Sequence, residues 1–83
     1  LKQNYPNPFN PTTQIQYELP EAGNISLKVY NMLGEVVIEL DKGFKTAGMH
    51  TITFDGSMLP SGVYFYQLRS GDFVRTRKMT FMK

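Results

Sequence analysis

Hydrophobic and polar side chains alternate along much of this chain with the two-residue period of a β-strand. In residues 14–19 the side chains of Ile15, Tyr17 and Leu19 face one way, and the Gln and Glu side chains between them face the other. Residues 25–31 repeat the pattern, and their inward set is Ile25, Leu27 and Val29. Each segment is therefore predicted to be a half-buried strand.

Two further segments continue the alternation between turns rich in glycine, proline and asparagine. Residues 35–40 and residues 49–55 are both predicted to be strands. The inward set is Val36, Ile38 and Leu40 in the first, and His50, Ile52 and Phe54 in the second. Residues 41–48 between them surround a single aromatic, Phe44, and form a longer connection with room for a short edge strand.

The last third of the sequence is predicted to be a β-hairpin around which the other strands are arranged. A turn signal at residues 60–62 precedes a β-branched and aromatic run, and residues 70–72 reverse the chain into a second run. The first run carries large apolar side chains on both faces, which predicts a central strand covered on both faces. In the second run neither parity stays apolar from Phe73 to Phe81, so a β-bulge is predicted midway along it.

Residues 1–13 differ from the rest because three of them are prolines, which fix φ and lack a backbone donor. We expect an extended lead-in whose Tyr5 and Phe9 pack onto the core, with a ligand-binding loop as the alternative. Residues 14–83 are expected to form one β-sandwich domain. Because the sequence begins with Leu1 and not with methionine, we expect it to be a module of a longer protein.

The predicted elements together define an all-β fold. No segment shows the 3.6-residue period of an amphipathic helix, and six clear strands, with a seventh near Phe44, are separated by glycine- and proline-rich turns. We therefore expect an immunoglobulin-like antiparallel β-sandwich of about seven strands. A chain of 83 residues makes one domain with a thin core.

Composition argues against catalytic chemistry. Cysteine is absent and His50 is the only histidine, so a thiolate zinc site or a cysteine nucleophile is not available. The seven carboxylates are dispersed, and Glu35 and Glu39 are expected on a solvent face, where the pKa separation of an acid–base pair does not arise. We predict a protein that is not an enzyme and that uses no metal or cofactor.

The one concentrated charge feature is a basic cluster near the end of the chain. Its members are Arg69, Arg75, Arg77, Lys78 and Lys83. Two interpretations stay open: charged side chains on the last strand discourage edge-to-edge pairing, or the cluster is a docking surface for an acidic partner or an anionic lipid headgroup. A formal net charge of +2 is too small to indicate nucleic-acid binding.

Several separated motifs occur in a fixed order along the chain. They are QNYPNPFNPTT at residues 3–13, VYNMLG at 29–34, LPSGVY at 59–64, residues 71–78, and an apolar-then-basic ending at 79–83. Together they resemble the C-terminal sorting domain of type IX secretion substrates, in its type A form, the Por secretion tail. The resemblance covers essentially the whole chain. It implies an immunoglobulin-like sandwich, which is also the fold of the related domain in the flagellar hook capping protein.

The resemblance implies a sorting signal and not a catalytic activity. Members of the family reach the periplasm with an ordinary signal peptide, and the outer-membrane translocon then recognises the folded domain and delivers its N-terminal cargo to the cell surface or the medium. A surface cysteine peptidase often removes the domain and joins the cargo to lipopolysaccharide. The residues that the resemblance assigns to translocon recognition are Pro60, Gly62, Tyr64, Gly71, Lys78 and Lys83.

Two other functions stay open from the residues alone. One is a self-assembling or adhesive module, in which the lead-in or an edge strand pairs with a neighbouring copy. The other is a carbohydrate-binding module with aromatic stacking rings. The candidate rings are Tyr5, Phe9, Tyr30 and Tyr66.

Overall fold

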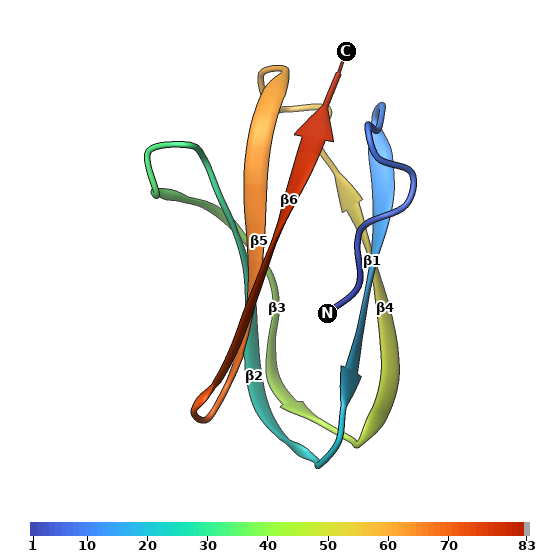
Figure 1. The fold of residues 1–83 in the computed structure, drawn as a ribbon, viewed down its shortest axis with the longest axis vertical. Coiled ribbons are helices and arrows are strands. Elements are labelled where there is room, and N and C mark those ends of the chain that lie inside the picture. Colours follow the sequence, from blue (N-terminus) through green and yellow to red (C-terminus); the bar gives the residue numbers. More distant parts are fainter. Residues whose placement is uncertain (83) are drawn as a thin grey trace.

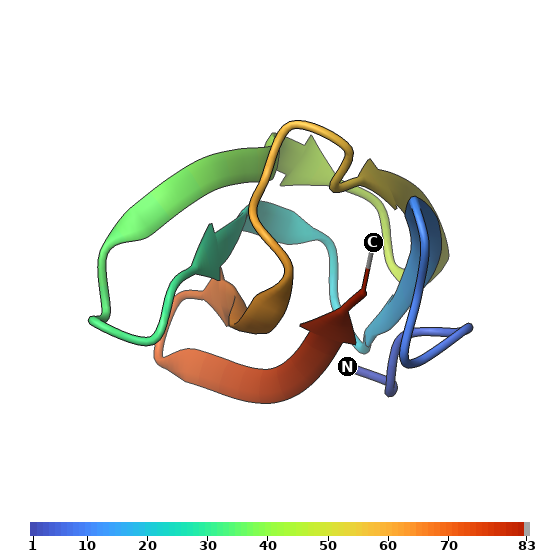
Figure 2. The ribbon, with the colours of Figure 1, turned by 90° about the horizontal axis from the view of Figure 1, so that it is seen from above.

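The structure, a computed structural model, describes residues 1–82 as six β-strands without a helix. The strands are β1 (Thr12–Leu19), β2 (Gly23–Tyr30), β3 (Val36–Lys45), β4 (Gly48–Asp55), β5 (Gly62–Ser70) and β6 (Phe73–Phe81). They form two antiparallel sheets that face each other, one of order β1-β4 and one of order β3-β2-β5-β6 (Figures 1 and 2). The predicted all-β sandwich is confirmed. No helix that would be long and apolar enough to cross a membrane occurs in the described chain.

The expected seventh strand near Phe44 is absent from residues 1–82. Instead, β3 runs without a break to Lys45, and its pairing with β2 continues through Gly43 and Phe44. Apolar alternation stops at Leu40, so the sequence pattern ends before the strand does. An edge strand pairs on one side only and tolerates polar side chains, which explains why hydrophobicity underestimates its length.

The core lies between the two sheets and takes one face of β1, β2 and β5, with further side chains from β4, β6 and the chain before β1. The prediction that β5 is covered on both faces was wrong, because no described element lies on the outer face of its sheet. The buried apolar side chains of the core are Phe9, Ile15, Tyr17, Leu19, Ile25, Leu27, Val29, Phe54, Tyr64, Tyr66, Leu68, Met79 and Phe81. The inward positions predicted for β1 and β2 are all among them, so these two predictions are confirmed. In β4 the inward side becomes more buried along the strand, from a partly buried His50 to a fully buried Phe54.

The facing predicted for β3 was wrong at two of three positions. Val36 and Ile38 are 52% and 42% exposed, whereas Val37 and Leu40 pack against the core. The register between β2 and β3 shifts twice, and Val37 and Leu40 are the β3 residues left without a partner on β2. Two irregularities of the β-bulge type therefore change the facing of β3, and simple alternation does not predict this change.

The bulge predicted in β6 does not occur. The strand pairs with β5 in one continuous register, from Phe73 opposite Ser70 to Phe81 opposite Gly62. The inner face of β6 therefore carries two charged residues, Arg75 and Arg77, between its apolar ends. Both stay exposed, because β6 is an edge strand at the open side of the sandwich.

Residues 1–11, which we call the strap, close the open side between β1 and β6 (Figure 2). The Lys2 N–H donates to the Gln16 carbonyl, and Tyr5 exchanges two backbone hydrogen bonds with Gln14 of β1. Phe9 forms a parallel bridge to the end of β6 and is buried, as predicted. The prediction for Tyr5 was wrong: its side chain is 81% exposed, because the neighbouring Asn4 takes the inward position.

Candidate functional site

Three of the residues assigned to recognition lie together where β5 begins. Tyr64 is buried, and its hydroxyl donates to the Pro60 carbonyl at 2.7 Å, which ties the turn to the strand that follows it. Between them Gly62 has a φ of +157°, a conformation that residues with a Cβ rarely adopt. Pro60, Gly62 and Tyr64 therefore act as one structural unit, at the end of the molecule where the chain terminates (Figure 1).

The structure does not bring Gly71 to this turn. Gly71 lies in the β5–β6 turn, at the opposite end of the hairpin, with a left-handed φ of +59°. Its role in the fold is to reverse the chain between two strands of nine residues each. Lys83, the last residue assigned to recognition, lies outside the described residues.

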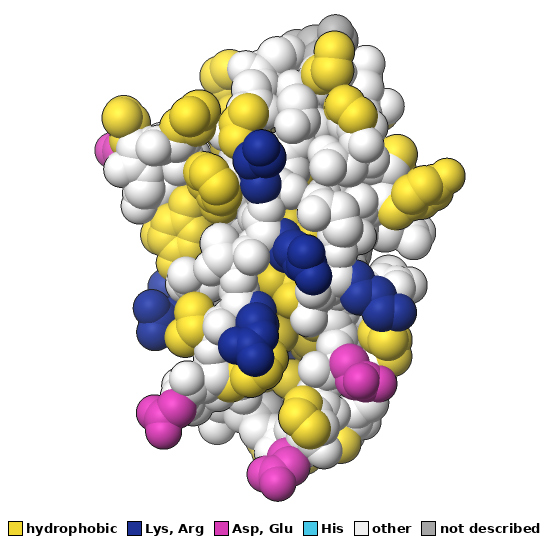
Figure 3. All heavy atoms as spheres, in the orientation of Figure 1, with side chains coloured by type: hydrophobic (Ala, Val, Ile, Leu, Met, Phe, Trp, Pro, Cys, Tyr) yellow, Lys and Arg dark blue, Asp and Glu magenta, His cyan; other side chains and the backbone are white. Residues whose placement is uncertain are grey.

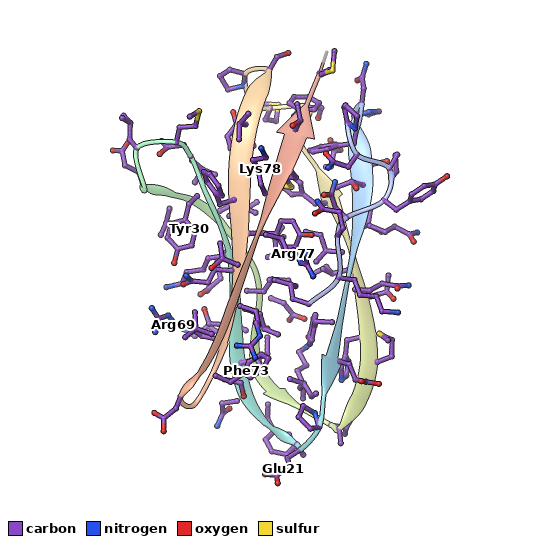
Figure 4. All side chains as sticks on the ribbon, viewed as in Figure 1. Glu21, Tyr30, Arg69, Phe73, Arg77 and Lys78 are labelled. Atoms are coloured by element: carbon purple, nitrogen blue, oxygen red, sulfur yellow. The ribbon has the colours of Figure 1, made fainter. Side chains whose placement is uncertain are left out.

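The basic cluster divides between the two faces of β6. On the inner side, the Arg75 guanidinium lies 4.5 Å from the centre of the Phe73 ring, and Arg77 Nε donates to the Leu1 carbonyl at 3.2 Å. On the outer side, Lys78 lies opposite Phe65, and Arg69 lies on the same outer face of β5. Figure 4 shows Arg69 away from β1 and β4, and Arg77 toward the space between the sheets.

Acidic side chains are absent from β2, β5 and β6, which together carry five of the basic residues. Figure 3 shows Lys and Arg side chains along the middle of one face, with Asp and Glu side chains at its periphery. Within residues 1–82 the one ion pair joins Lys45 to Asp41 of β3 at 3.0 Å. The half of the molecule built from β2, β5 and β6 is therefore positive without internal compensation.

Sequence reasoning missed a buried polar network that holds the strap to the core. Asn4 and Thr13 are 2% and 1% exposed, and Asn4 Nδ2 donates to Thr13 Oγ1 and to the Pro6 carbonyl, both at 2.9 Å. The Tyr66 hydroxyl accepts from the Asn4 N–H at 2.7 Å and donates to the Lys2 carbonyl at 2.6 Å. The available signal was that Asn4 and Thr13 both lie inside the motif at residues 3–13.

Tyr17 of the core and the partly buried His50 are both held by contacts within the fold. Burial, followed by the charge of Asp41 and a hydrogen bond of 3.1 Å to it, raises the pKa of Tyr17 to about 12. For Asp41, burial favours a higher pKa, but hydrogen bonds from Lys45, Tyr17 and the Lys42 N–H outweigh it and lower the pKa. The His50 ring stacks on Tyr17 at 5.2 Å, and its Nε2 lies 2.8 Å from the Thr46 carbonyl.

These features form one folded unit, and the comparison with family models covers nearly all of it. The model of the secretion system C-terminal sorting domain matches residues 3–82. The chain belongs to this family. In this type IX secretion sorting domain the matched region includes all six strands and the strap from residue 3 onward, so the fold described above is the fold of the sorting domain itself. No curated protein matches the chain, and no solved structure matches it.

The sorting domain offers few groups for chemistry in the part that the structure describes. No three His, Cys, Asp or Glu residues among residues 1–82 lie close enough to hold a metal ion. Of the four candidate stacking rings, Phe9 and Tyr66 are fully buried and so are not available to a sugar, and Tyr5 and Tyr30 lie on the strap and on β2. Sorting domains of this family are in general not catalytic.

Proposed function

We propose that this sorting domain directs a cargo protein, joined to its N-terminal side, across the outer membrane by the type IX system. The observation that carries the proposal is the family match over residues 3–82. On this proposal the cargo passes through the periplasm and reaches the cell surface or the medium. The partners are the outer-membrane translocon and its surface cysteine peptidase, and the domain itself performs no reaction.

We further propose that the six recognition residues divide into two kinds. Pro60, Gly62 and Tyr64 act through the turn that they form, because the Tyr64 hydroxyl is engaged by the Pro60 carbonyl. Gly71 acts through the reversal at the other end of the hairpin. Lys78 is exposed and makes no ion pair within the described residues, which supports direct contact with the translocon. Lys83 is proposed to extend the same basic end.

The proposal is tested by placing residues 1–83 behind a signal peptide and a fluorescent reporter, in a host with a working type IX system. Wild type is compared with Lys78→Ala and with deletion of Lys83. Lys42→Ala serves as the matched control, since Lys42 is an exposed lysine on β3. Surface reporter is quantified by its accessibility to added protease, and a thermal melt of each purified domain reports its folding.

The expected result is surface reporter for wild type and for Lys42→Ala. Lys78→Ala and the Lys83 deletion should retain the reporter in the periplasm while their melting temperatures stay close to that of wild type. Retention of the wild-type reporter in the periplasm would contradict the sorting function. Surface delivery of both variants would leave the sorting function intact and contradict direct contact between the translocon and these two lysines.

A further inference from the structure

The outer face of the four-stranded sheet is not covered by any element among residues 1–82. It holds a hollow of about 380 Å³ beside the β2–β3 turn. Its lining includes Tyr30, Phe65, Gln67, Arg69 and Thr76. Its floor is ordered by two side-chain hydrogen bonds, because Gln67 Nε2 donates to Thr76 Oγ1 at 3.1 Å and the Tyr30 hydroxyl lies 3.4 Å from Gln67 Oε1.

Cations without an opposing acid stand at both ends of this floor. Arg69 lies opposite Val74 on β6 and Ser26 on β2, and Lys78 lies opposite Phe65, so neither faces a carboxylate across the sheet. The acidic residue that the register places on this face, Glu39 of β3, lies opposite Lys28. At the centre of the floor Lys28 of β2 lies beside Gln67 and opposite Glu39, and at each end stands a cation that faces no acid across the sheet.

The spacing of the two cations matches the repeat of an extended chain. Phe65 and Arg69 are four residues apart on β5, and Lys78 is the partner of Phe65, so the two charges lie about 13 Å apart along the strands. Same-face side chains of an extended peptide recur about every 6.7 Å. Carboxylates at positions i and i+4 would therefore reach Arg69 and Lys78, and the side chain at i+2 would lie over Gln67 and the Tyr30 ring.

We propose that this face binds an extended acidic segment of a partner protein, with carboxylates at i and i+4 and an apolar side chain at i+2. Charge complementarity selects the acidic residues, and the part of the hollow beside Gln67 and the Tyr30 ring accepts the apolar one. An anionic membrane fits the surface less well, because Arg75 and Arg77 face the other side of β6 and add no charge to this face. The proposal goes beyond sorting, since the purified domain should bind such a segment in the absence of the translocon.

The test is a titration of the ¹⁵N-labelled domain with synthetic peptides, followed by nuclear magnetic resonance. The probe peptide is Thr-Glu-Thr-Leu-Thr-Glu-Thr, which presents both carboxylates and the leucine on one face. The control peptide, Thr-Glu-Thr-Leu-Glu-Thr-Thr, has the same composition but turns its second carboxylate to the opposite face. Vesicles of phosphatidylglycerol form a third arm, which reports binding to an anionic membrane.

The probe peptide should shift the amide signals of Tyr30, Gln67, Arg69 and Thr76, with a Kd about tenfold below that of the control peptide. Arg69→Glu and Lys78→Glu should each weaken the probe about tenfold, whereas Arg75→Glu, on the inner face of the same sheet, should not. Equal affinity for the two peptides, equal loss in Arg75→Glu, or shifts with vesicles alone would each overturn the proposal. A thermal melt of each variant verifies its fold before titration.

Discussion

Tyr66 performs two tasks that only a phenol can combine. Its ring fills the core, and its hydroxyl bonds to two backbone groups of the strap, the Asn4 N–H and the Lys2 carbonyl. In Tyr66→Phe the ring stays, but a buried donor and a part-buried acceptor lose their partner. We expect the free energy of unfolding to fall by about 1–3 kcal/mol in urea denaturation.

Tyr30→Phe is the control for this substitution. The Tyr30 hydroxyl makes a single long contact of 3.4 Å on the outer face of the sheet, so its loss should change stability by about 0.5 kcal/mol or less. Equal effects of the two substitutions would mean that the hydroxyl of Tyr66 does not hold the strap.

Tyr17 gives the fold a dependence on alkaline pH. Its pKa is raised from the ordinary 10.0 to about 12, mainly by burial, so the folded state keeps the proton that the unfolded state releases. This contribution to stability is complete below about pH 10 and is lost as the pH rises toward about 12. We expect the free energy of unfolding of wild type to fall across this window, measured by urea denaturation at several pH values.

Tyr17→Phe should show a shallower fall across the same pH window. A remaining decline is expected, because burial also raises the pKa of Tyr66, against the opposing effects of the Asn4 N–H and Arg77. Identical pH profiles for wild type and Tyr17→Phe would show that Tyr17 ionises equally in both states. Ultraviolet absorbance of the phenolate provides an independent titration of the folded protein.

Single residues of the strap show where sequence reasoning fails. A pattern of aromatic residues predicts that both Tyr5 and Phe9 anchor the strap, yet the structure buries Phe9 and exposes Tyr5. The inward position belongs to Asn4, because its N–H and its side-chain amide find partners on Tyr66 and Thr13, which only the folded chain brings to it. Burial of a polar residue depends on such partners, and hydrophobic alternation carries no information about them.

At the scale of elements, the inward residues of a strand are predicted correctly where apolar and polar side chains alternate without interruption. β1 and β2 alternate cleanly, and each of their predicted inward residues is buried. β3 and β6 are the two edges of the larger sheet, and there the sequence misplaced bulges, missing two in β3 and predicting one in β6. Edge strands carry charges and irregular pairing that interrupt alternation for reasons unrelated to the core.

The candidate site was also predicted only in part. The turn of Pro60, Gly62 and Tyr64 is readable from its residue types, because a proline, a glycine and a following aromatic favour a turn into a strand. The division of the basic cluster was not predicted, since it depends on the β6 register that the bulge prediction had wrong. Lys78 and Arg77 are neighbours in sequence but face opposite sides of the sheet.

The strap is an element anchored by one aromatic residue. The Phe9 ring stacks on Phe81 at 5.1 Å and meets Phe54 edge-on at 5.8 Å. Phe9→Ala should therefore lower the free energy of unfolding by about 3–5 kcal/mol, measured by urea denaturation. Phe44→Ala, at an aromatic that is 66% exposed on β3, should change it by about 0.5 kcal/mol or less.

A loss in Phe9→Ala no larger than in Phe44→Ala would contradict the anchoring role of Phe9. Were the Phe9→Ala domain too unstable to purify, Phe9→Leu would keep an apolar side chain at the site and give an intermediate loss. The order wild type, Phe9→Leu, Phe9→Ala in stability is then the expected outcome.

At the scale of the whole molecule, one sheet has two strands and the other has four. On one side of the sandwich the strap fills the space between β1 and β6. It pairs with the outer edge of β1, and its Phe9 N–H donates to the Thr80 carbonyl of β6 at 3.0 Å. Side chains engage two more carbonyls of β6, since Gln3 donates to Lys78 and Arg75 donates to Val74. This side of the sandwich is thereby protected against pairing with a second copy.

Removal of residues 1–5 should turn this protected side into an interface. The truncated domain keeps Phe9, but it exposes the backbone of Gln14 and Gln16 on β1 and the Lys78 carbonyl on β6. Unpaired strand edges associate, so we expect dimers or larger species that grow with concentration, measured by size-exclusion chromatography with light scattering. Tyr5→Ala is the control, because it removes an exposed side chain and keeps every backbone bond of the strap, and it should elute with wild type as a monomer. A truncated domain that keeps its β-sheet circular dichroism and stays monomeric over the same concentrations would show that the strap stabilises the fold without guarding its edges.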